Sequence, residues 1–250
     1  MKTIHLLGTP LLATSHDELI AHCQNWAQSN GAIAVDFTNT HIVTLRRADA
    51  AFRQDTEAMD YFVPDSMPLK WCLNLRGARM KDRLYGPDFM RRCVVASPAP
   101  VTHYLLGGSG ECLHRLEANL RAQQPNLLIL GRHHGYFGES DSPEIVGEIN
   151  RLSPDFIWVG LGTPKQQAWI RRWKSGIHRG VLFAVGFAFD ANAGTKKDSP
   201  RWMQRAGLGW LYRLLAEPTR LGPRYLKYNS LFLWYLLADA ARGRAYQSHA

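Results

Sequence analysis

"DFIWVGLGTPKQQAWIRRW", residues 155–173, carries the pattern that decides the fold. The run Phe-Ile-Trp-Val at 156–159 is continuously apolar, which is typical of a strand buried on both faces of a sheet. A glycine-containing loop follows at 160–164, and the chain then continues as a helix. Strand, loop and helix in this order form part of a βαβ unit, so the stretch predicts a parallel sheet.

The same succession recurs along the chain. We expect strands in 31–38, in 61–63 before a turn at 64–65, and again near 101–107, 126–131 and 180–185. Helices are expected from about 40, from about 68, and over 110–123 and 144–152. Strands that alternate with helices at this spacing predict an α/β fold with a parallel sheet flanked by helices.

The first twenty residues, "MKTIHLLGTPLLATSHDELI", partly resemble a signal peptide, because a lysine precedes an apolar run. His5, Gly8 and Pro10 interrupt that run. Ser15–Glu18 then has the form of a capping box that opens a helix. We therefore expect a short strand, a turn and a helix.

Composition places the chain among globular proteins with a sizeable core: 250 residues, 46% hydrophobic and 20% charged. No CxxC occurs, so the sequence indicates neither a zinc knuckle nor a redox pair. Scattered cysteines fit a reducing cytosol. The four are Cys23, Cys72, Cys93 and Cys112.

Positive charge is concentrated at the C-terminus. Residues 196–250 contain ten Lys/Arg and three acidic residues, and so carry +7 of the net charge of +9. This asymmetry predicts an anionic partner, which could be nucleic acid, a membrane surface or a phosphorylated substrate. We divide the chain into a core, 1–195, with two subregions of about 1–100 and 101–195, and a basic, aromatic-rich helical appendage, 196–250.

Two apolar segments lie in the appendage, at 207–215 and 231–238. Neither reaches the roughly 20 residues that a membrane-spanning helix needs. Aromatic side chains interleaved with Arg and Lys favour a helix lying in a membrane interface. A terminal helix pair packed on the core, with a solvated basic face, is the alternative.

Three glycine-containing loops follow predicted strands, at 107–110, 131–138 and 160–167. In open α/β sheets ligands bind beyond the carboxyl ends of the strands. Bare backbone N–H groups and a helix N-terminus there suit a nucleotide or phosphate. Tight βα turns are the simpler explanation for each loop alone. The first loop lacks the third glycine of a dinucleotide fingerprint, since position 113 is Leu, and the last does not match a Walker A loop.

Metal binding is not expected. The histidines at 133–134 lack further ligands at matching spacing, and the acidic pairs at 55–57 and 139–141 are typical of solvated turns. Two other carboxylates end apolar strands. Asp65 could be a turn residue, a helix cap or a catalytic base, and Asp190 could be a helix cap or a hydrogen-bond acceptor for a ligand.

Taken together, these motifs resemble the TagA/WecG/CpsF glycosyltransferase family (glycosyltransferase family 26). The matching stretches occur in family order and cover roughly residues 1–230. They are Asn39 with its flanks, "PDSMPLKW", "GARMKDRLYGPDF", "HYLLGG", "GRHHGYF", "PDFIWVGLGTPKQQAWI", "AVGFAFDANAG" and "WLYRLLAEPTRLGPRY".

The resemblance implies a Rossmann-like core whose C-terminal appendage docks on an anionic membrane surface and lends arginines to the active site. Members are metal-independent, inverting transferases without a cofactor. They move a hexose, such as N-acetylmannosamine, mannosaminuronate or glucose, from a UDP-sugar to a polyprenyl-diphosphate-linked saccharide. The implied location is peripheral, on the cytoplasmic face of the membrane, in cell-surface polysaccharide synthesis. A homo-oligomer is possible, and no nucleic acid is expected.

Residue roles carry over by motif. Asp65 matches the proposed catalytic base. Substrate-binding positions are Thr38, Asn39, Arg83, Arg213, Arg220 and Arg224. Nucleotide-binding positions are Gly107, Gly135, Tyr136, Gly160, Gly162, Pro164, Lys165, Gln166, Gln167 and Asp190.

The sequence departs from the family pattern at four places. Phe37 stands where a threonine is usual, with Thr38 shifted by one, and Ser66 replaces a glycine after the aspartate. Gln167 removes a carboxylate, and Phe187 stands where small residues are common. These departures bear on the identity of the donor sugar more than on the reaction class.

A rival interpretation is a Rossmann-like nucleotide- or nucleic-acid-binding module with a basic tail. It accounts for the charge, but neither for the three strand-end loops nor for the order of the motifs. A Rossmann oxidoreductase is weaker still, because the dinucleotide fingerprint is incomplete.

Overall fold

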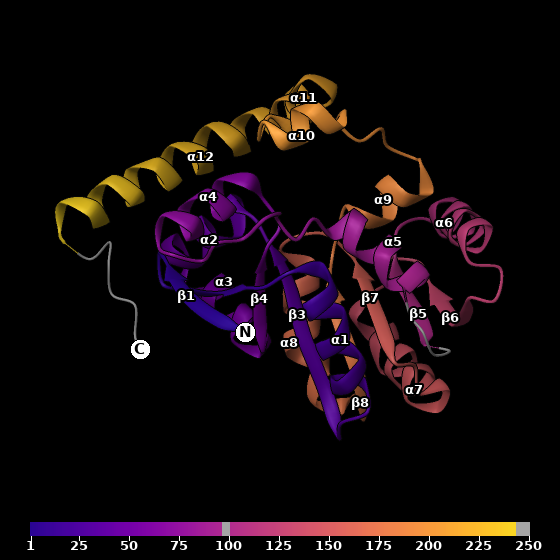
Figure 1. The fold of residues 1–250 in the computed structure, drawn as a ribbon. Helices are drawn as coiled ribbons and strands as arrows, with labels where there is room; N and C mark the ends of the chain where they lie inside the picture. Colours follow the sequence, from indigo (N-terminus) through magenta and orange to yellow (C-terminus); the bar gives the residue numbers. More distant parts are fainter. Residues whose placement is uncertain (97–100, 244–250) are drawn as a thin grey trace.

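The computed structural model describes residues 1–96 and 101–243. Within them, eight strands form one sheet in the order β1-β2-β4-β3-β8-β7-β5-β6 (Figure 1). Every neighbouring pair is parallel except β1 and β2, which confirms the expected α/β fold with a parallel sheet. The strands are β1 Lys2–Leu6, β2 Thr9–Ala13, β3 Gly31–Thr38, β4 Tyr61–Pro64, β5 Thr102–Gly107, β6 Leu128–His133, β7 Phe156–Gly160 and β8 Arg179–Ala184.

Helices cover both faces of the sheet. One face packs against α1 His16–Ala27, α5 Gly86–Ala96, α6 Gly110–Gln123 and α9 Ala188–Ala193. The other packs against α2 Thr40–Ala48, α4 Met67–Leu75, α7 Ser142–Leu152 and α8 Lys165–Trp173, with α3 Ala50–Asp55 beside them. The appendage contains α10 Arg201–Arg205, α11 Gly209–Ala216 and α12 Pro218–Ala241, and short 3₁₀ turns occur at 56–58, 139–141 and 174–176.

The apolar run 156–159 shows why the strands are continuously apolar. Phe156 and Trp158 are buried in the core on one face of the sheet, and Ile157 and Val159 in the core on the other. Because successive side chains of a strand point to opposite faces, a strand covered by helices on both sides needs apolar residues at every position.

The two expected subregions of the core share this one sheet. β8 of the second subregion pairs with β3 of the first along six residue pairs, from Gly31↔Arg179 to Asp36↔Ala184. The expected boundary between the subregions falls at 97–100, outside the described residues.

The N-terminus corrects one expectation. The sequence predicts a strand, a turn and a helix, whereas the structure has an antiparallel hairpin, β1–β2, before the helix. Leu7 and Gly8 form its turn with φ of 52° and 79°. Two positive φ angles match the strand twist of a tight hairpin, and glycine adopts such angles without strain. Ser15 caps α1 as expected, accepting a hydrogen bond from the Glu18 N–H at 3.2 Å.

The described part of the appendage, 196–243, crosses over the core at the ends of several strands (Figure 1). Its longest helix, α12, packs along α2. Arg47 of α2 donates two hydrogen bonds to the Asp239 carboxylate, at 2.7 and 2.8 Å, and lies over the Tyr235 ring. Leu221 and Phe232 of α12 are buried. Arg244, counted above in the basic charge of the appendage, lies outside the described residues.

The opposite side of α12 is exposed and apolar. We call its four residues the α12 ridge: Leu226, Leu233, Trp234 and Leu237, with exposed fractions of 76, 60, 62 and 69%. The helix therefore packs on the core along one side and presents apolar side chains along another. In the described part of the chain, no helix is both long and apolar enough to cross a bilayer.

Candidate active site

A cavity of about 720 Å³ lies at the carboxyl ends of β3, β4, β5, β7 and β8, below α11 and α12. The three glycine-containing loops converge there, because parallel strands end at the same edge of a sheet. They contribute Gly108–Ser109, Gly135–Tyr136 and 160–163 to its wall. The appendage closes the opposite side with arginines.

Eleven of the residues expected at the site line this cavity. They come from the ends of strands far apart in the sequence, from the loops and first helical turns that follow these strands, and from α11 and α12 of the appendage. They are Asn39, Asp65, Gly135, Tyr136, Gly160, Gly162, Gln166, Asp190, Arg213, Arg220 and Arg224.

Six expected residues do not line the cavity but lie next to it. Lys165 donates to the Gly135 carbonyl at 2.9 Å, so it holds one loop to the next. Pro164 precedes it at the start of α8. Gly107, with a φ of 142°, packs on the backbone of Gly160, where an added Cβ would come within 2.5 Å of the carbonyl group. Thr38, Gln167 and Arg83 are described below.

Asp65 follows β4 and is half-buried at the cavity wall. Its Oδ1 accepts a hydrogen bond from the Gly86 N–H at 2.7 Å, and its own N–H donates to the Thr38 carbonyl at 2.7 Å. Burial raises the pKa of this carboxyl, and Arg83, the Gly86 N–H and Arg213 oppose that rise. A carboxylate with a raised pKa is a stronger base.

Asp65 does not cap the following helix. Ser66 holds the N-cap position of α4, without a side-chain capping hydrogen bond. Its φ of −112° and ψ of 150° are ordinary for any residue, so this backbone does not need glycine. The Ser66 hydroxyl is buried without a hydrogen-bond partner among the described residues.

Asn39 is the N-cap of α2, and its Oδ1 accepts from the Ile42 N–H at 3.2 Å. This leaves its amide N–H₂ for a ligand. His41, two residues further on, also lines the cavity. Burial and the charge of Arg224 lower the pKa of His41 to about 4, so its imidazole is neutral at physiological pH. His41 has no motif in the sequence that would have singled it out.

Beneath the cavity lies a buried carboxylate that sequence reasoning missed. Asp36 of β3 is fully buried. Its Oδ2 accepts from Gln167 Nε2 at 2.7 Å, and the Thr38 hydroxyl donates to Oδ1. Thr38 and Gln167 are thus bound to a common partner below the cavity floor. Burial raises the pKa of Asp36 to about 6, against the hydrogen bonds from Thr38 and Gln167 and the charge of Arg46.

Asp36→Asn is expected to stabilise the protein at neutral pH. Since the folded-state pKa of Asp36 lies above its ordinary value of 3.8, its contribution to stability is full below about pH 4 and is lost as the pH rises through about 6. The loss is on the order of 2 to 3 kcal/mol. An asparagine avoids this loss. In the wild type Gln167 Oε1 has no hydrogen-bond partner among the described residues, and after a flip of the Gln167 amide it can accept from the asparagine N–H₂.

Urea unfolding at about pH 4 and about pH 8 measures this effect. Asp155→Asn is the matched control with the opposite sign. Burial alone would raise the pKa of Asp155, but hydrogen bonds from Thr102 and Arg179 outweigh it and hold the pKa below its ordinary value. Asp155→Asn should therefore destabilise at pH 8. The account of Asp36 is wrong if its asparagine variant gains no stability there.

Arg213 of α11 reaches the cavity wall, where its guanidinium lies over the Phe187 ring at 3.7 Å and donates to the Tyr85 hydroxyl at 2.9 Å. Arg220 is ion-paired with Glu217. Arg224 has a buried Nε without a hydrogen-bond partner among the described residues. Arg83 lies off the cavity and donates to Gln204 of α10 at 3.1 Å.

Asp190 lies in the first turn of α9 and is not its N-cap, which is Phe187. Its carboxylate accepts from the Thr195 hydroxyl at 2.8 Å and lies 3.5 Å from the Lys196 ammonium. Lys196 also lies 3.7 Å from Glu217, so its ammonium lies between carboxylates of α9 and of the appendage.

Three of the four carboxylates in the acidic pairs at 55–57 and 139–141 have protein partners. Asp55 pairs with Arg171 at 3.5 Å, Glu139 pairs with Arg172, and Asp141 accepts from the Gly138 N–H at 2.8 Å. Across residues 1–96 and 101–243, no group of three or more His, Cys, Asp or Glu side chains could hold a metal ion.

Comparison with known proteins agrees with the motif order. A Staphylococcus aureus protein (strain NCTC 8325), named N-acetylglucosaminyldiphosphoundecaprenol N-acetyl-beta-D-mannosaminyltransferase, is 28% identical over 244 residues, which span 96% of this chain and 93% of the relative. Its counterpart from strain MRSA252 matches with the same identity and coverage. A profile of the Glycosyl transferase WecG/TagA/CpsF family matches residues 4–246. The resemblance is confirmed, and the chain belongs to the WecG/TagA/CpsF family of glycosyltransferases.

Proposed function

We propose that this protein transfers a hexose from a UDP-sugar to a polyprenyl-diphosphate-linked saccharide, with inversion at the anomeric carbon and without a metal ion. The observation that carries the proposal is the cavity itself. It combines one half-buried carboxylate, Asp65, with three arginines from the appendage and with glycine loops at strand ends. A base and a diphosphate-binding surface in one cavity are what a single displacement requires.

In the proposed reaction Asp65 accepts the proton of the acceptor hydroxyl. The hydroxyl oxygen forms a bond to the anomeric carbon as the bond from that carbon to the UDP oxygen breaks. The diphosphate leaves with the bonding electron pair, and the proton on Asp65 passes to solvent. One displacement inverts the configuration.

Negative charge develops on the departing diphosphate. Arg213, Arg220 and Arg224 supply guanidinium groups, which pair bidentately with phosphate oxygens. The N-terminus of α6, whose N-cap Ser109 lines the cavity, supplies backbone N–H groups and a favourable dipole. Donors fixed in a partly dry cavity stabilise developing charge better than water does.

The acceptor proposal draws on the relatives, whose name specifies N-acetylglucosaminyldiphosphoundecaprenol as acceptor and an N-acetyl-beta-D-mannosaminyl group as the group transferred. An acceptor of this chemistry keeps its lipid in the bilayer. We therefore assign the α12 ridge to the membrane interface, on the cytoplasmic face. Lys227 and Arg242 of the same appendage provide charge for anionic headgroups.

Transfer by the full-length protein on anionic vesicles tests the function. The vesicles carry polyprenyl-diphosphate-linked N-acetylglucosamine, and the donor is one of a panel: UDP-linked N-acetylmannosamine, mannosaminuronate, glucose or N-acetylglucosamine. One donor should yield a β-linked product with one UDP released per sugar transferred. The rate should be unchanged in excess EDTA. Transfer of sugar phosphate with release of UMP, no transfer with any donor, or EDTA inhibition reversed by Mg²⁺ would contradict the proposal.

A further inference from the structure

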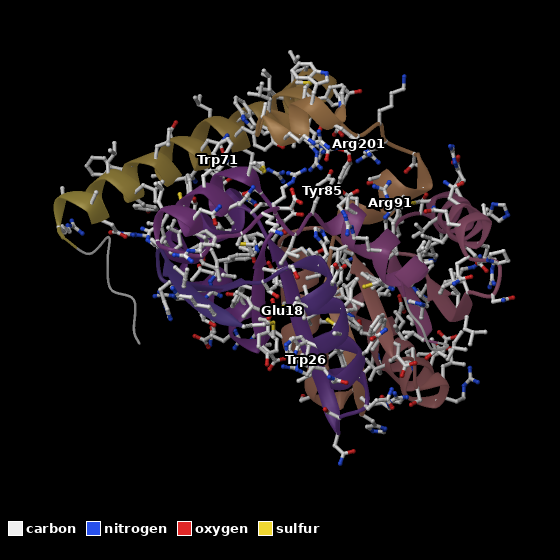
Figure 2. All side chains as sticks on the ribbon, viewed as in Figure 1. Glu18, Trp26, Trp71, Tyr85, Arg91 and Arg201 are labelled. Atoms are coloured by element: carbon white, nitrogen blue, oxygen red, sulfur yellow. The ribbon has the colours of Figure 1, made fainter. Side chains whose placement is uncertain are left out.

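Tyr85 joins the core to the appendage at the cavity. It directly precedes α5, its side chain is buried, and it lies at the junction beneath α10 and α11 (Figure 2). Its hydroxyl accepts a hydrogen bond from Arg213 Nη2 at 2.9 Å. The same hydroxyl donates to the Asp198 carboxylate, 2.9 Å from each oxygen. Tyr85 lies within the family-like stretch "GARMKDRLYGPDF", but no role was expected for it, and Asp198 lies outside every matching stretch.

These hydrogen bonds all point in one direction: Arg213 donates to Tyr85, and Tyr85 donates to Asp198. Asp198 is held by the Ser199 N–H at 2.8 Å and by Gln204 Nε2 at 3.1 Å. A hydroxyl that donates to a carboxylate becomes a stronger acceptor for its own donor. Asp198 therefore strengthens the hold of Tyr85 on the Arg213 guanidinium without an ion pair between the two charges.

The ring of Tyr85 is fixed independently of its hydroxyl. Arg83 lies over the ring at 4.0 Å from its centroid and donates to Gln204 at 3.1 Å. Removing the hydroxyl should therefore leave the ring in place. Arg213 would keep its contact with the Phe187 ring and its attraction to the Asp65 and Asp198 carboxylates. Neither fixes the plane of the guanidinium as firmly as a directed hydrogen bond does.

The residue after Tyr85 contacts the proposed base. Gly86 donates its N–H to Asp65 Oδ1 at 2.7 Å. Two adjacent residues thus position the proposed base through the backbone and the proposed leaving-group cation through a side chain. Any displacement of this pair changes both groups together.

We propose that Tyr85 is a positioning residue for the transfer reaction, whose hydroxyl fixes Arg213 in the wall of the cavity that Asp65 lines. This inference rests on the proposed function. Because charge on the leaving diphosphate develops only in the transition state, a misplaced Arg213 lowers kcat more than it changes the KM for donor.

Tyr85→Phe tests the inference, with Tyr104→Phe as the matched control. Each substitution removes a phenol hydroxyl that donates to a carboxylate and keeps a buried ring, but Tyr104 bonds to Glu148, away from the cavity. Tyr85→Phe should lower kcat about 10-fold or more, with a smaller change in KM. Tyr104→Phe should transfer sugar at the wild-type rate.

Coupling to Arg213 separates positioning from a general loss of structure. The double variant Tyr85→Phe/Arg213→Lys should be little slower than Arg213→Lys alone, since the hydroxyl acts only through the guanidinium. Effects that multiply fully, or a Tyr85→Phe variant with wild-type kcat, would overturn the inference.

A pKa measurement on the substrate-free protein tests whether Tyr85 anchors Arg213. The charged groups facing Asp65 are Arg83, Arg213 and Asp198, with Asp36 below. Since Arg213 lowers the pKa of Asp65, its release in Tyr85→Phe should raise that pKa, read by ¹³C NMR of the carboxyl. The acid limb of kcat/KM should move to higher pH with it. An Asp65 pKa that is unchanged in Tyr85→Phe would show that the hydroxyl does not anchor Arg213. A wild-type protein that is inactive with every donor would instead refute the proposed function, and the pKa shift could still be measured.

Discussion

Asp65→Asn is expected to lower turnover by about 10²-fold or more while leaving the affinity for the UDP-sugar nearly unchanged. Asparagine has the shape of aspartate, and its Oδ1 can still accept the hydrogen bond from Gly86. It cannot accept the acceptor proton as the new bond forms. The loss therefore falls on the chemical step. Initial rates on vesicles and calorimetric titration with the UDP-sugar measure the two quantities.

Asp60→Asn is the matched control. Asp60 also lies next to β4 and also accepts a backbone N–H, that of Ala34 at 2.7 Å, but it does not line the cavity. Its variant should transfer sugar at close to the wild-type rate. Near-normal turnover by Asp65→Asn would remove Asp65 from the role of base and direct attention to the remaining polar groups of the wall.

Replacing two residues of the α12 ridge, Leu233→Ser with Trp234→Ser, is expected to weaken binding to anionic vesicles on the order of 10²-fold. Each apolar side chain that enters the interface contributes roughly 1.5 kcal/mol or more, and two such contributions correspond to about that factor. Turnover of a lipid-embedded acceptor should fall in parallel. Turnover of a water-soluble, short-chain acceptor should not change, because the cavity is intact.

Leu128→Ser with Leu130→Ser provides the control, since both are exposed leucines on β6, away from the appendage (Figure 1). Vesicle binding by this variant should equal that of the wild type. If the α12 variant sediments with vesicles as well as the wild type does, the ridge is not the membrane surface. Tight DNA binding at about 0.15 M salt would instead favour the nucleic-acid alternative, because contacts to phosphate alone weaken steeply with salt.

Local pattern predicted most of the sheet, and its one missed strand has a physical explanation. Continuous apolar runs predict β3, β5, β7 and β8, which are largely buried, and also β6 at the sheet edge, whose side chains alternate between exposed and half-buried. β2, in contrast, contains Pro10, which cannot donate to a ladder and so argues against a strand. In the structure Pro10 lies near the start of β2, opposite His5 in the hairpin, where a proline is tolerated.

The appendage shows a second limit. The predicted apolar segment 207–215 corresponds to α11, whereas the segment 231–238 is only part of α12, one helix of 24 residues that runs through Pro223. A non-proline residue at position 223 would donate its N–H to the Thr219 carbonyl in the first turn of the helix, so the proline removes only that one hydrogen bond. Packing of α12 along α2 stabilises the helix across that point.

Cavity residues that directly follow a strand could be predicted from the sequence. Contacts between residues far apart in the sequence could not be predicted. Asp65 and the glycine loops belong to the first kind. Asp36 and Gln167 are 131 positions apart, and Tyr85 and Arg213 are 128 apart. No spacing rule connects such pairs, because the sheet order and the docking of the appendage bring them together.

The α12 helix connects the cavity wall to the α12 ridge. Arg224 of the cavity wall and Trp234 of the exposed ridge belong to the same helix, ten residues and hence roughly 15 Å apart along its axis. The two hydrogen bonds from Arg47 to Asp239 hold that helix against the core. With the ridge in the headgroups, as proposed, the cavity wall and the membrane contact are parts of one helix, so the cavity keeps a fixed position relative to the bilayer surface.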